Sequence, residues 1–496
     1  MKQLKVLPLV AIISGLMVGC GGGGGGGGSS TPPPKYTWQM VNLYSAERAD
    51  VGAGCVIYGV QEGQTDRVIA AKVANAGFKV LYHNADGSVI SEDTIDAIPS
   101  NGKVTIDSGK VPTDGYVSVE ELDGTIGGTQ DVYMFSVQKN FLRNLVINVR
   151  QSQSSSNSCF KGEQNDVEVS EDAAITVAQS SASTSYYQSS FINSAVAGHE
   201  VASNIPVRAP LKTNEKVLVT AFDSYSSGKP GDLKYFVFAD GSSIYDISNP
   251  SSSVPIIFME TADRSDVNFN VSGISINSDD SSIVVGFNSE LYQWQPIFDS
   301  TSLLSYTSSN LSANGWSVEL SGSVDSGDWK YHSLNPYDGN DIAIDAPIVS
   351  SFGSSSISSS CDSASYCLSG NGFGPEDYDI QRTHLRSTTT NSSRNFYQTI
   401  FAKPDRNQVM MESSEEVLMP DNSRDRLEVS IASLDPSDSN SVMYFLENSL
   451  DIQSVITTSV PDFADVNGSV SNASDIKKRW LKLMSENVTI VENGKN

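Results

Sequence analysis

Histidine is scarce in this sequence, and its four copies fall into no metal-binding or catalytic pattern. They lie far apart, at His83, His199, His332 and His384, and none has a second histidine at the spacing of a zinc-protease helix. The chain also lacks a Gly-x-Ser-x-Gly nucleophile motif, a Cys-x-x-Cys-His haem motif and a glycine loop for phosphate. These absences remove the commonest catalytic centres, so we expect no enzymatic turnover and no bound cofactor.

Basic residues are few. The chain of 496 residues has 32 Lys and Arg against 58 Asp and Glu, a net charge of −26. Two of the lysines, Lys2 and Lys5, lie in the first nineteen residues, so the rest of the chain carries 30 bases, 58 acids and a net charge of −28. This sign is wrong for binding nucleic acid or an anionic membrane surface. We therefore predict no nucleic-acid partner.

Long hydrophobic runs are also missing, apart from one at the very start. Val6–Val18 is an apolar run of thirteen residues that follows the two lysines. The run is too short to cross a bilayer as a helix. Its order of basic, then apolar, then small residues is typical of a secretory signal peptide.

The end of this run has a recognisable motif, Leu16–Cys20. It resembles the lipobox of bacterial lipoproteins, in which the cysteine is acylated and becomes the new N-terminus, although Met17 stands where that family usually has leucine. The resemblance implies a signal peptide over residues 1–19 and a membrane anchor at Cys20. Gly21, rather than aspartate, follows the cysteine, which resembles lipoproteins that are exported to the outer membrane.

Residues 20–35 have the composition of a tether. Gly21–Gly28 is a run of eight glycines, followed by serine, threonine and Pro32–Pro34. Glycine has the largest backbone freedom, so such a run holds no fold. A coil of this length spans about 20 Å on average. A tether is useful only if the start of the chain is fixed, which supports lipidation of Cys20.

Four cysteines remain besides Cys20. An even number in an exported chain favours disulfides, and three pairings are possible. We predict Cys55–Cys159 and Cys361–Cys367, because each pair then lies within one proposed structural unit. Four buried free thiols are the alternative.

β-strand patterns follow one another from residue 36 to residue 160. About seven short alternating runs separated by turns predict a β-sandwich. The stretch from Ala85–Gly87 to Asp114–Val119 resembles transthyretin-like and carboxypeptidase-regulatory domains, which implies a stalk or spacer. The predicted strands are Tyr36–Tyr44, Cys55–Val60, Gly77–Tyr82, Ser88–Ile90, Lys103–Asp107, Gly115–Glu120, Asp131–Val137 and Asn144–Val149.

A different pattern extends over residues 161–470. Two apolar residues at alternate positions precede an aspartate, and another apolar residue follows it; we interpret each copy as a hairpin with an aspartate in its turn. Gly273–Gly286 followed by Leu291–Trp294 resembles one blade of a WD40-like β-propeller, which implies a propeller for this region. The spacing of 39 residues between Asp240 and Asp279 fits one blade. The aspartates concerned are Asp172, Asp240, Asp279 and Asp405.

Residues 347–394 are rich in serine and threonine and predict an exposed insertion around the Cys361–Cys367 loop. Beyond it, Leu427–Ile431 and Ser441–Phe445 predict further strands. Residues 471–496 contain the only predicted helix, over Asp475–Met484, with Ser474 as its N-cap.

Aromatic residues cluster between residues 292 and 337. Aromatic faces beside carboxylates suit a sugar-binding surface, whereas packing between blades explains the same residues without a ligand. The candidate ligand-binding residues are Trp294, Trp316, Trp329, Tyr331, Tyr337 and Asp338.

Three acidic clusters contain enough oxygen ligands for Ca²⁺, although none matches an EF-hand loop and we favour solvated turns for each of them. We predict no metal, with calcium as the alternative. The clusters are Asp338, Asp341 and Asp345; Asp435 and Asp438; and Asp421, Asp425 and Glu428.

The sequence thus predicts an all-β protein with an N-terminal β-sandwich, a β-propeller and a short C-terminal helix. We expect a lipid-anchored lipoprotein of the outer membrane that binds a protein or polysaccharide of the cell envelope and serves as a non-enzymatic scaffold. A glycan-binding surface lipoprotein using the Trp294–Tyr337 aromatics is the alternative function, and a hydrolase with dispersed carboxylates is a third.

Overall fold

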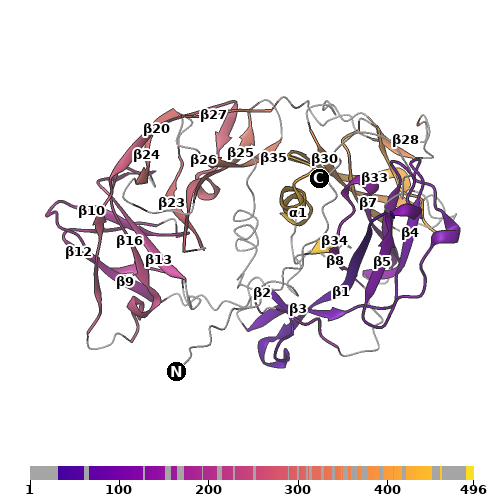
Figure 1. Ribbon diagram of the computed structural model, residues 1–496, viewed down its shortest axis with the longest axis horizontal. Helices are drawn as coiled ribbons and strands as arrows, with labels where there is room; N and C mark the ends of the chain where they lie inside the picture. The colour runs from indigo at the N-terminus through magenta and orange to yellow at the C-terminus, as the bar shows by residue number, and fades with distance from the viewer. Residues whose placement is uncertain are drawn as a thin grey trace, which may run out of the picture. The chain divides into compact units, whose positions relative to one another are not determined.

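The structure is a computed structural model (Figure 1). The predicted signal peptide, Cys20 and most of the tether lie outside the residues that it describes. Those residues are 32–495, without 61–65, 127–128, 151–157, 163, 165–171, 193, 209–214, 227–228, 250–252, 289, 299–300, 309–310, 312–314, 326–328, 338–340, 348, 350–355, 359–360, 362–365, 370–377, 390–394, 406, 416–419, 449–457 and 461–487.

The prediction of an all-β protein is confirmed. Strands make up most of the described chain, which contains a single α-helix, α1 (Ser439–Asn448). No helix in the described ranges is long and apolar enough to cross a membrane. The predicted helix over 475–484 lies outside the described residues.

Strand β1 (Lys35–Glu47) organises the first sheet. On one edge it pairs successively with β5 and β3, and on the other edge it runs parallel to β8. Seven of the eight predicted strands of this region recur, six with shifted ends and Lys103–Asp107 with the predicted ends. Ser88–Ile90 forms only an isolated bridge, and β3 was not predicted. The remaining members of this six-stranded sheet are β2 (Ile57–Val60), β3 (Arg67–Val73), β5 (Lys103–Asp107), β8 (Leu145–Asn148) and β34 (Thr458–Val460).

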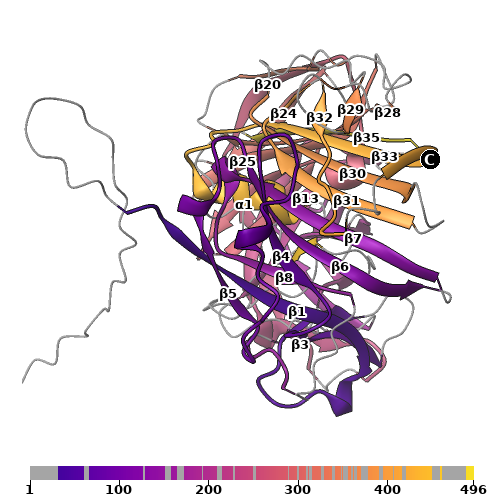
Figure 2. The same ribbon diagram turned by 90° about the vertical axis from the view of Figure 1, so that its right-hand side faces the viewer.

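A twelve-stranded sheet forms the largest layer. Its strands β6, β7, β31 and β30 follow one another side by side (Figure 2). Because β7 pairs with β31 in parallel, this sheet crosses the predicted boundary at residue 160. In order, it contains β23 (Glu290–Pro296), β22 (Ser282–Phe287), β25 (Gly315–Val324), β26 (Lys330–Tyr337), β35 (Val488–Lys495), β33 (Pro420–Ser433), β30 (Ile380–Thr389), β31 (Asn395–Ala402), β7 (Thr129–Gln138), β6 (Tyr116–Ile126) and β4 (Lys79–His83), with β21 (Ile274–Ile276) paired to β25.

The six-stranded sheet packs on part of this large sheet as a sandwich. Trp38 and Met40 from β1 share a hydrophobic core with Phe135 from β7 and Phe401 from β31. The rings of Trp38 and Phe135 meet edge to face at 6.3 Å. Alternation along the strands explains this core, since every second side chain of a strand points to the same face.

Strand β30 corrects the predicted insertion at 347–394. Residues 380–389 form an inner strand of the large sheet, paired with β31 on one edge and β33 on the other. The composition was misleading because the polar side chains of Gln381, Arg382 and Thr383 on β30 are buried and hydrogen-bonded. Gln381 donates to Thr383 Oγ1 at 2.7 Å, and Arg382 donates to Ser430 Oγ at 2.7 Å.

Helix α1 corrects the predicted strand at Ser441–Phe445. The Asp438 carboxylate accepts from the backbone N–H groups of Asn440 and Ser441, as an N-capping side chain does. The apolar run after this cap places Val442 and Leu446 one turn apart in the core shared by the two sheets. The N-cap therefore favours a helix over a strand at Ser441–Phe445.

Two further sheets stack on each other between residues 173 and 261. Ile175 and Val177 from the smaller sheet pack against Val219 and Val237 from the larger one. The five-stranded sheet contains β11 (Val196–Gly198), β10 (Ser185–Ser189), β13 (Lys216–Phe222), β16 (Leu233–Asp240) and β19 (Glu260–Thr261). The four-stranded sheet contains β12 (Val201–Pro206), β9 (Ala173–Ala178), β17 (Tyr245–Asp246) and β18 (Ile256–Phe258).

The other face of the five-stranded sheet is also covered. Phe222 and Phe236 share a core with Trp294 from β23, and the rings of Phe236 and Trp294 are 5.1 Å apart. Three layers of sheet therefore follow one another here, from β23 through the five-stranded sheet to the four-stranded sheet.

The predicted propeller is not confirmed. Propeller blades are repeated four-stranded sheets, whereas the sheets here differ in size, and β22 lies between β23 and β25 instead of in a simple meander. The predicted aspartate hairpins are wrong where both arms are described. β16 and β17, before and after Asp240, belong to different sheets, as do β31 and β32 (Gln408–Val409) around Asp405; β21 and β22, around Asp279, both pair with β25.

Both predicted disulfides are confirmed. Cys55 pairs with Cys159 across 104 residues, with their Cα atoms 5.5 Å apart, and Cys361 pairs with Cys367 at 6.1 Å. The second bond lies at a small sheet that includes β32. The remaining strands are β28 (Ser356–Ser358) and β29 (Cys367–Ser369) of that sheet, β20 (Arg264–Ser272), β24 (Thr301–Ser308) and β27 (Ile342–Asp345) of another, and the pair β14 (Tyr225–Ser226) and β15 (Lys229–Pro230).

Candidate functional site

The aromatic residues predicted as a sugar-binding surface lie in the core instead. Trp294, Trp329 and Tyr331 are 0%, 1% and 3% exposed, and all three belong to one hydrophobic cluster. Trp316 is half-buried and meets Trp294 edge to face at 5.1 Å. A sugar stacks on an accessible ring, so these buried side chains do not form the predicted surface.

Neighbouring strands explain this burial. Trp294, Trp316 and Tyr331 lie on β23, β25 and β26, whose side chains form the third layer beneath the five-stranded sheet. The side chain of Tyr337 and the whole of Asp338 lie outside the described residues. The glycan-binding alternative therefore has no support from the residues that the structure places.

Two of the three acidic clusters have members that hydrogen-bond to nearby residues, and the side chains of Asp421 and Asp425 in the third lie outside the described residues. The Asp341 carboxylate accepts from both the backbone and the side-chain N–H of Asn268 at 3.0 Å, and this hydrogen bonding holds its pKa below the ordinary value. Asp435 accepts from Ser437, and Asp438 caps α1. Among the described residues, no group of three or more His, Cys, Asp or Glu side chains gathers in a way that could hold a metal ion.

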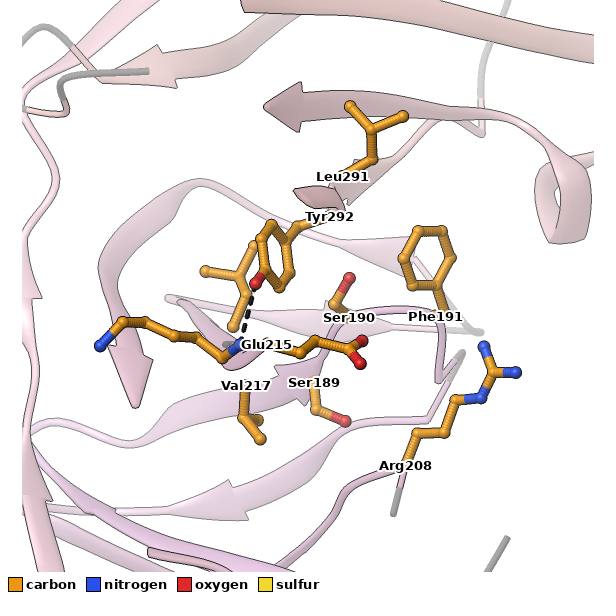
Figure 3. A pocket seen from close by; sticks show the side chains of 10 residues that line it. Ser189, Ser190, Phe191, Arg208, Glu215, Val217, Leu291 and Tyr292 are labelled. Carbon is orange, nitrogen blue, oxygen red and sulfur yellow. Dashed lines mark hydrogen bonds between the residues drawn. The ribbon is translucent and has the colours of Figure 1, made fainter. Parts of the chain in front are cut away.

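A small hollow lies where the five-stranded sheet meets β23. Its cavity volume is about 30 Å³, and Ser189, Ser190, Val217 and Tyr292 line it (Figure 3). The Tyr292 hydroxyl accepts a hydrogen bond from the backbone N–H of Lys216 at 3.0 Å. Burial raises the pKa of Tyr292 to about 12, so the hydroxyl stays protonated at neutral pH.

Phe191 has an unusual backbone at the rim of this hollow. Its φ is +61°, a conformation that bulky residues seldom adopt. Two hydrogen bonds to β23 hold it there: its N–H donates to Gln293 Oε1 at 2.9 Å, and Gln293 N donates to Ser190 Oγ at 2.7 Å. The strained turn fixes one sheet on the other, so we interpret the hollow as a joint between layers.

The outer face of the four-stranded sheet is a second candidate site. We call it the β9 face, and it consists of Val201, Ile247, Ile256 and Phe258 around the outward side chains of β9. These four are the only large apolar side chains counted as exposed among the described residues, at 48%, 39%, 50% and 77%. Their gathering on one sheet is the feature to explain, because apolar side chains exposed singly are ordinary, whereas a contiguous patch marks an interaction surface.

Strand register places these side chains on one face. Val201 and Phe258 both pair with Ala178, from opposite edges of β9, and Ile256 pairs with Thr176. Residues directly opposite each other across paired strands project to the same side. The intervening β9 residues, Ile175 and Val177, project the other way into the core between the two sheets.

A hydrogen-bond network stiffens this face. The Tyr245 hydroxyl donates to Asn204 Oδ1 at 2.9 Å and accepts from the backbone N–H of Asn204. It also lies 3.0 Å from Thr176 Oγ1 in the centre of the sheet. Asn204 sits at a β-bulge with φ of +57°. The β9 face is therefore a fixed surface that needs little ordering before it binds a partner.

Neither a protein-family model, nor a curated protein, nor a solved structure matches the chain.

Sequence reasoning did not predict the β9 face. The usable signal was the segment Val254–Met259, where an apolar run follows a serine- and proline-rich turn without any polar alternation. Such a run predicts a strand buried on both faces. The structure departs from that rule, since only one face of β18 is covered.

Proposed function

We propose that the protein is a lipid-anchored lipoprotein of the outer membrane whose β-structured body is a non-enzymatic scaffold that holds a partner. The lipobox-like Leu16–Cys20 and the glycine run support the anchor. The body begins immediately after the tether, since β1 starts at Lys35 and its side chains Trp38 and Met40 are fully buried. Two disulfides fit an exported chain.

One observation supports the binding role most strongly: the exposed apolar side chains gather on the β9 face. Leaving Phe258 77% exposed forgoes the free energy that its burial would contribute, about 1.5–3 kcal/mol for a fully buried apolar side chain. A partner that covers the face recovers this term. The candidate sugar-binding aromatics are buried, so we propose a protein partner in preference to a polysaccharide.

The anchor is tested by Cys20→Ser in the producing cell. We expect the variant to accumulate unprocessed or to leave the membrane fraction, while wild type floats with outer membranes in a density gradient. A variant that processes and fractionates like wild type would overturn the proposed anchor.

The binding role is tested with a photo-crosslinking amino acid at Phe258, in intact cells. The matched control carries the same group at Thr105, an exposed position on β5. We expect a discrete adduct at Phe258 and none at Thr105. Equal labelling at both positions, or no adduct at either, would contradict a binding role for the β9 face.

A further inference from the structure

A segment that belongs to no strand or helix packs against the large sheet. It consists of residues 410–414, which directly follow β32, and we call it the strap. Met410 and Met411 are 1% and 0% exposed, and they share a hydrophobic cluster with Leu81 from β4 and Ile400 from β31. The strap is therefore part of the core, although no neighbouring strand pairs with it.

Two neighbours hold the middle of the strap. Gln398 on β31 donates to the Met411 carbonyl at 2.6 Å and accepts from the Met411 N–H at 3.1 Å. The Gly87 carbonyl, in the turn after β4, accepts from the Glu412 N–H at 3.0 Å. Gly87 has a φ of +84°, and a Cβ at this position would collide with the Met410 carbonyl oxygen. Only glycine allows the strap to approach the turn this closely.

Glu120 on β6 holds the end of the strap. Its side chain is 0% exposed, and its two carboxyl oxygens lie 3.0 and 3.2 Å from the backbone nitrogen of Ser414, which donates to them. Lys79 is its cross-strand neighbour on β4, but the Lys79 ammonium is partly exposed and lies 3.8 Å from Asp96. Glu120 itself forms no ion pair within the described chain. A buried carboxylate without a contacting cation is costly.

The surroundings of Glu120 favour its neutral form. Burial raises the pKa of Glu120, while hydrogen bonds from Ser413 and Ser414 and the charge of Lys79 oppose this shift only in part. The Ser414 hydroxyl is buried beside the carboxyl group and has no other hydrogen-bond partner among the described residues. A neutral carboxyl group can accept from the Ser414 N–H with one oxygen and donate to this hydroxyl with the other.

Other titratable groups lie near the strap. His83 Nδ1 is 3.0 Å from the Gly87 carbonyl, and burial lowers the pKa of His83 to about 4, so acid acts on this turn in the opposite sense. Burial raises the pKa of Tyr116 on β6 to about 12, which keeps that hydroxyl neutral. Glu412 is half-buried and Glu415 is exposed. The contribution of Glu120 must therefore be measured separately from that of His83.

We propose that the strap is a pH-dependent lock, which lies closed on the large sheet while Glu120 holds its proton and opens when the proton is lost. Loss of the proton leaves a buried charge that no described cation contacts, and lifting residues 410–414 lets water reach it. The pKa of Glu120 is higher in the closed state than in an open, solvated one. Closure is thus favoured fully below the ordinary value of about 4.3 and weakens as pH rises, until the raised pKa is passed. The lock is independent of the membrane anchor and of the β9 face.

Hydrogen exchange of the strap amides tests the lock. The purified mature chain and Glu120→Gln, which has the same shape and no charge, are compared from about pH 4 to 8 by mass spectrometry of peptides that cover the strap. Rates are corrected for the pH dependence of exchange in an unfolded chain. We expect the ratio of opening constants, wild type to variant, to rise about tenfold per pH unit above about pH 4.3 and then to level off. His83 is present in both proteins, so its titration cancels in the ratio.

Two further variants serve as controls. Glu415→Gln removes an exposed carboxylate directly after the strap and should leave the pH dependence as in wild type. Gly87→Ala places a methyl group against the Met410 carbonyl and should speed exchange of the strap at every pH. If Glu120→Gln does not fold, His83→Gln replaces it, because the opening constant of the strap should still rise above about pH 4.3 when the imidazole is absent.

Three results would overturn the lock. A ratio that stays constant across the pH range would mean that Glu120 titrates alike in the closed and open states. A ratio that falls as pH rises would mean that the carboxylate charge holds the strap closed. Loss of the pH dependence in Glu415→Gln would assign the response to the exposed carboxylate. Membrane release of Cys20→Ser and crosslinking at Phe258 bear on the anchor and the β9 face alone.

Discussion

Strands β30 and β9 are both inner strands of a sheet, but their residue composition does not match the burial of their side chains. β30 is rich in polar residues, yet Gln381 and Thr383 are fully buried. β9 carries no charged residue, yet its sheet exposes Val201 and Phe258. Each strand has partners on both edges, so backbone pairing does not distinguish them.

The difference lies in what covers the two faces of each sheet. Side chains from both faces of the large sheet enter hydrophobic clusters. The buried Gln381 and Arg382 of β30 donate hydrogen bonds to Thr383 on the same strand and to Ser430 on β33. Buried polar groups are stable when they are paired, and unpaired ones are costly. Val201, Ile247, Ile256 and Phe258 of the β9 face have no such cover among the described residues, so these four side chains remain available to a partner. The polar composition of residues 380–389 therefore predicted an exposed loop where the backbone pairing forms an inner strand.

Leu385→Ala, in the covered sheet, should have the largest effect. Leu385 is fully buried on β30, and its truncation leaves a cavity. We expect a loss of about 2–5 kcal/mol in the free energy of unfolding. Urea denaturation followed by tryptophan fluorescence measures it, since Trp294 and Trp329 lie in the same cluster. A loss below about 0.5 kcal/mol would mean that β30 is not an inner strand.

Acidification should lower the free energy of unfolding through His83, a buried polar residue of the same sheet. His83 on β4 is fully buried, its Nδ1 lies 3.0 Å from the Gly87 carbonyl, and its Nε2 has no hydrogen-bond partner within the described part of the chain. Burial lowers the pKa of His83 to about 4, so the folded state favours neutral imidazole. Its stabilising contribution is complete above pH 6.5 and is lost as pH falls through 4, on the order of 3 kcal/mol.

The measurement is stability against pH for wild type and His83→Gln, by thermal or urea unfolding. We expect the variant to lose the part of the acid slope that lies between pH 6.5 and 4. His199→Gln, at an exposed position, is the matched control. If His83→Gln and wild type have the same slope, the imidazole is not held neutral by burial.

Gln398→Leu tests whether a buried polar group in the covered sheet depends on its hydrogen bonds. Gln398 donates to the Met411 carbonyl at 2.6 Å and accepts from the Met411 N–H at 3.1 Å. Leucine leaves both backbone groups unpaired, at a cost of about 1–3 kcal/mol. Chemical denaturation should show this loss. If Gln398→Leu leaves the free energy of unfolding unchanged, the hydrogen bonds between Gln398 and Met411 contribute nothing to stability.

Phe258→Ala should have the smallest effect on the isolated protein. The side chain buries little surface, so we expect a change within about 0.5 kcal/mol in the free energy of unfolding. The same urea experiment as for Leu385→Ala provides the comparison. A loss above about 1.5 kcal/mol would mean that Phe258 is buried in the core. The β9 face would then be covered, as the faces of the large sheet are.

The sequence predicted the N-terminal strands well because their signal is local. Lys103–Asp107 alternates strictly between exposed and buried residues, and the structure has β5 over the same five residues. The same local method failed at Ser441–Phe445, where the capping carboxylate of Asp438 precedes the apolar run and starts a helix. Asp438 lies three residues before Ser441 in the sequence, and an N-capping residue at that position favours a helix over a strand.

The rest depended on contacts between distant residues. The parallel pairing of β7 with β31 joins segments more than 250 residues apart, and no local pattern encodes it. The burial of Trp294 follows from Phe236, which another sheet supplies. The exposure of the β9 face likewise follows from which layers exist, so residue types alone predicted the aromatics as the surface and missed Phe258.

The way in which the chain enters the body has a mechanical consequence. A pull on the proposed membrane anchor would reach the fold at Lys35 and be directed into β1, which is bonded to β5 and β3 along one edge and to β8 along the other. The Pro34 carbonyl is itself held by the backbone N–H and the hydroxyl of Ser108. Force along a strand paired on both edges must shear many hydrogen bonds together, whereas a hairpin pulled at its open end unzips one bond at a time. The attachment point is thus among the parts of the body that yield last when the anchor is stretched.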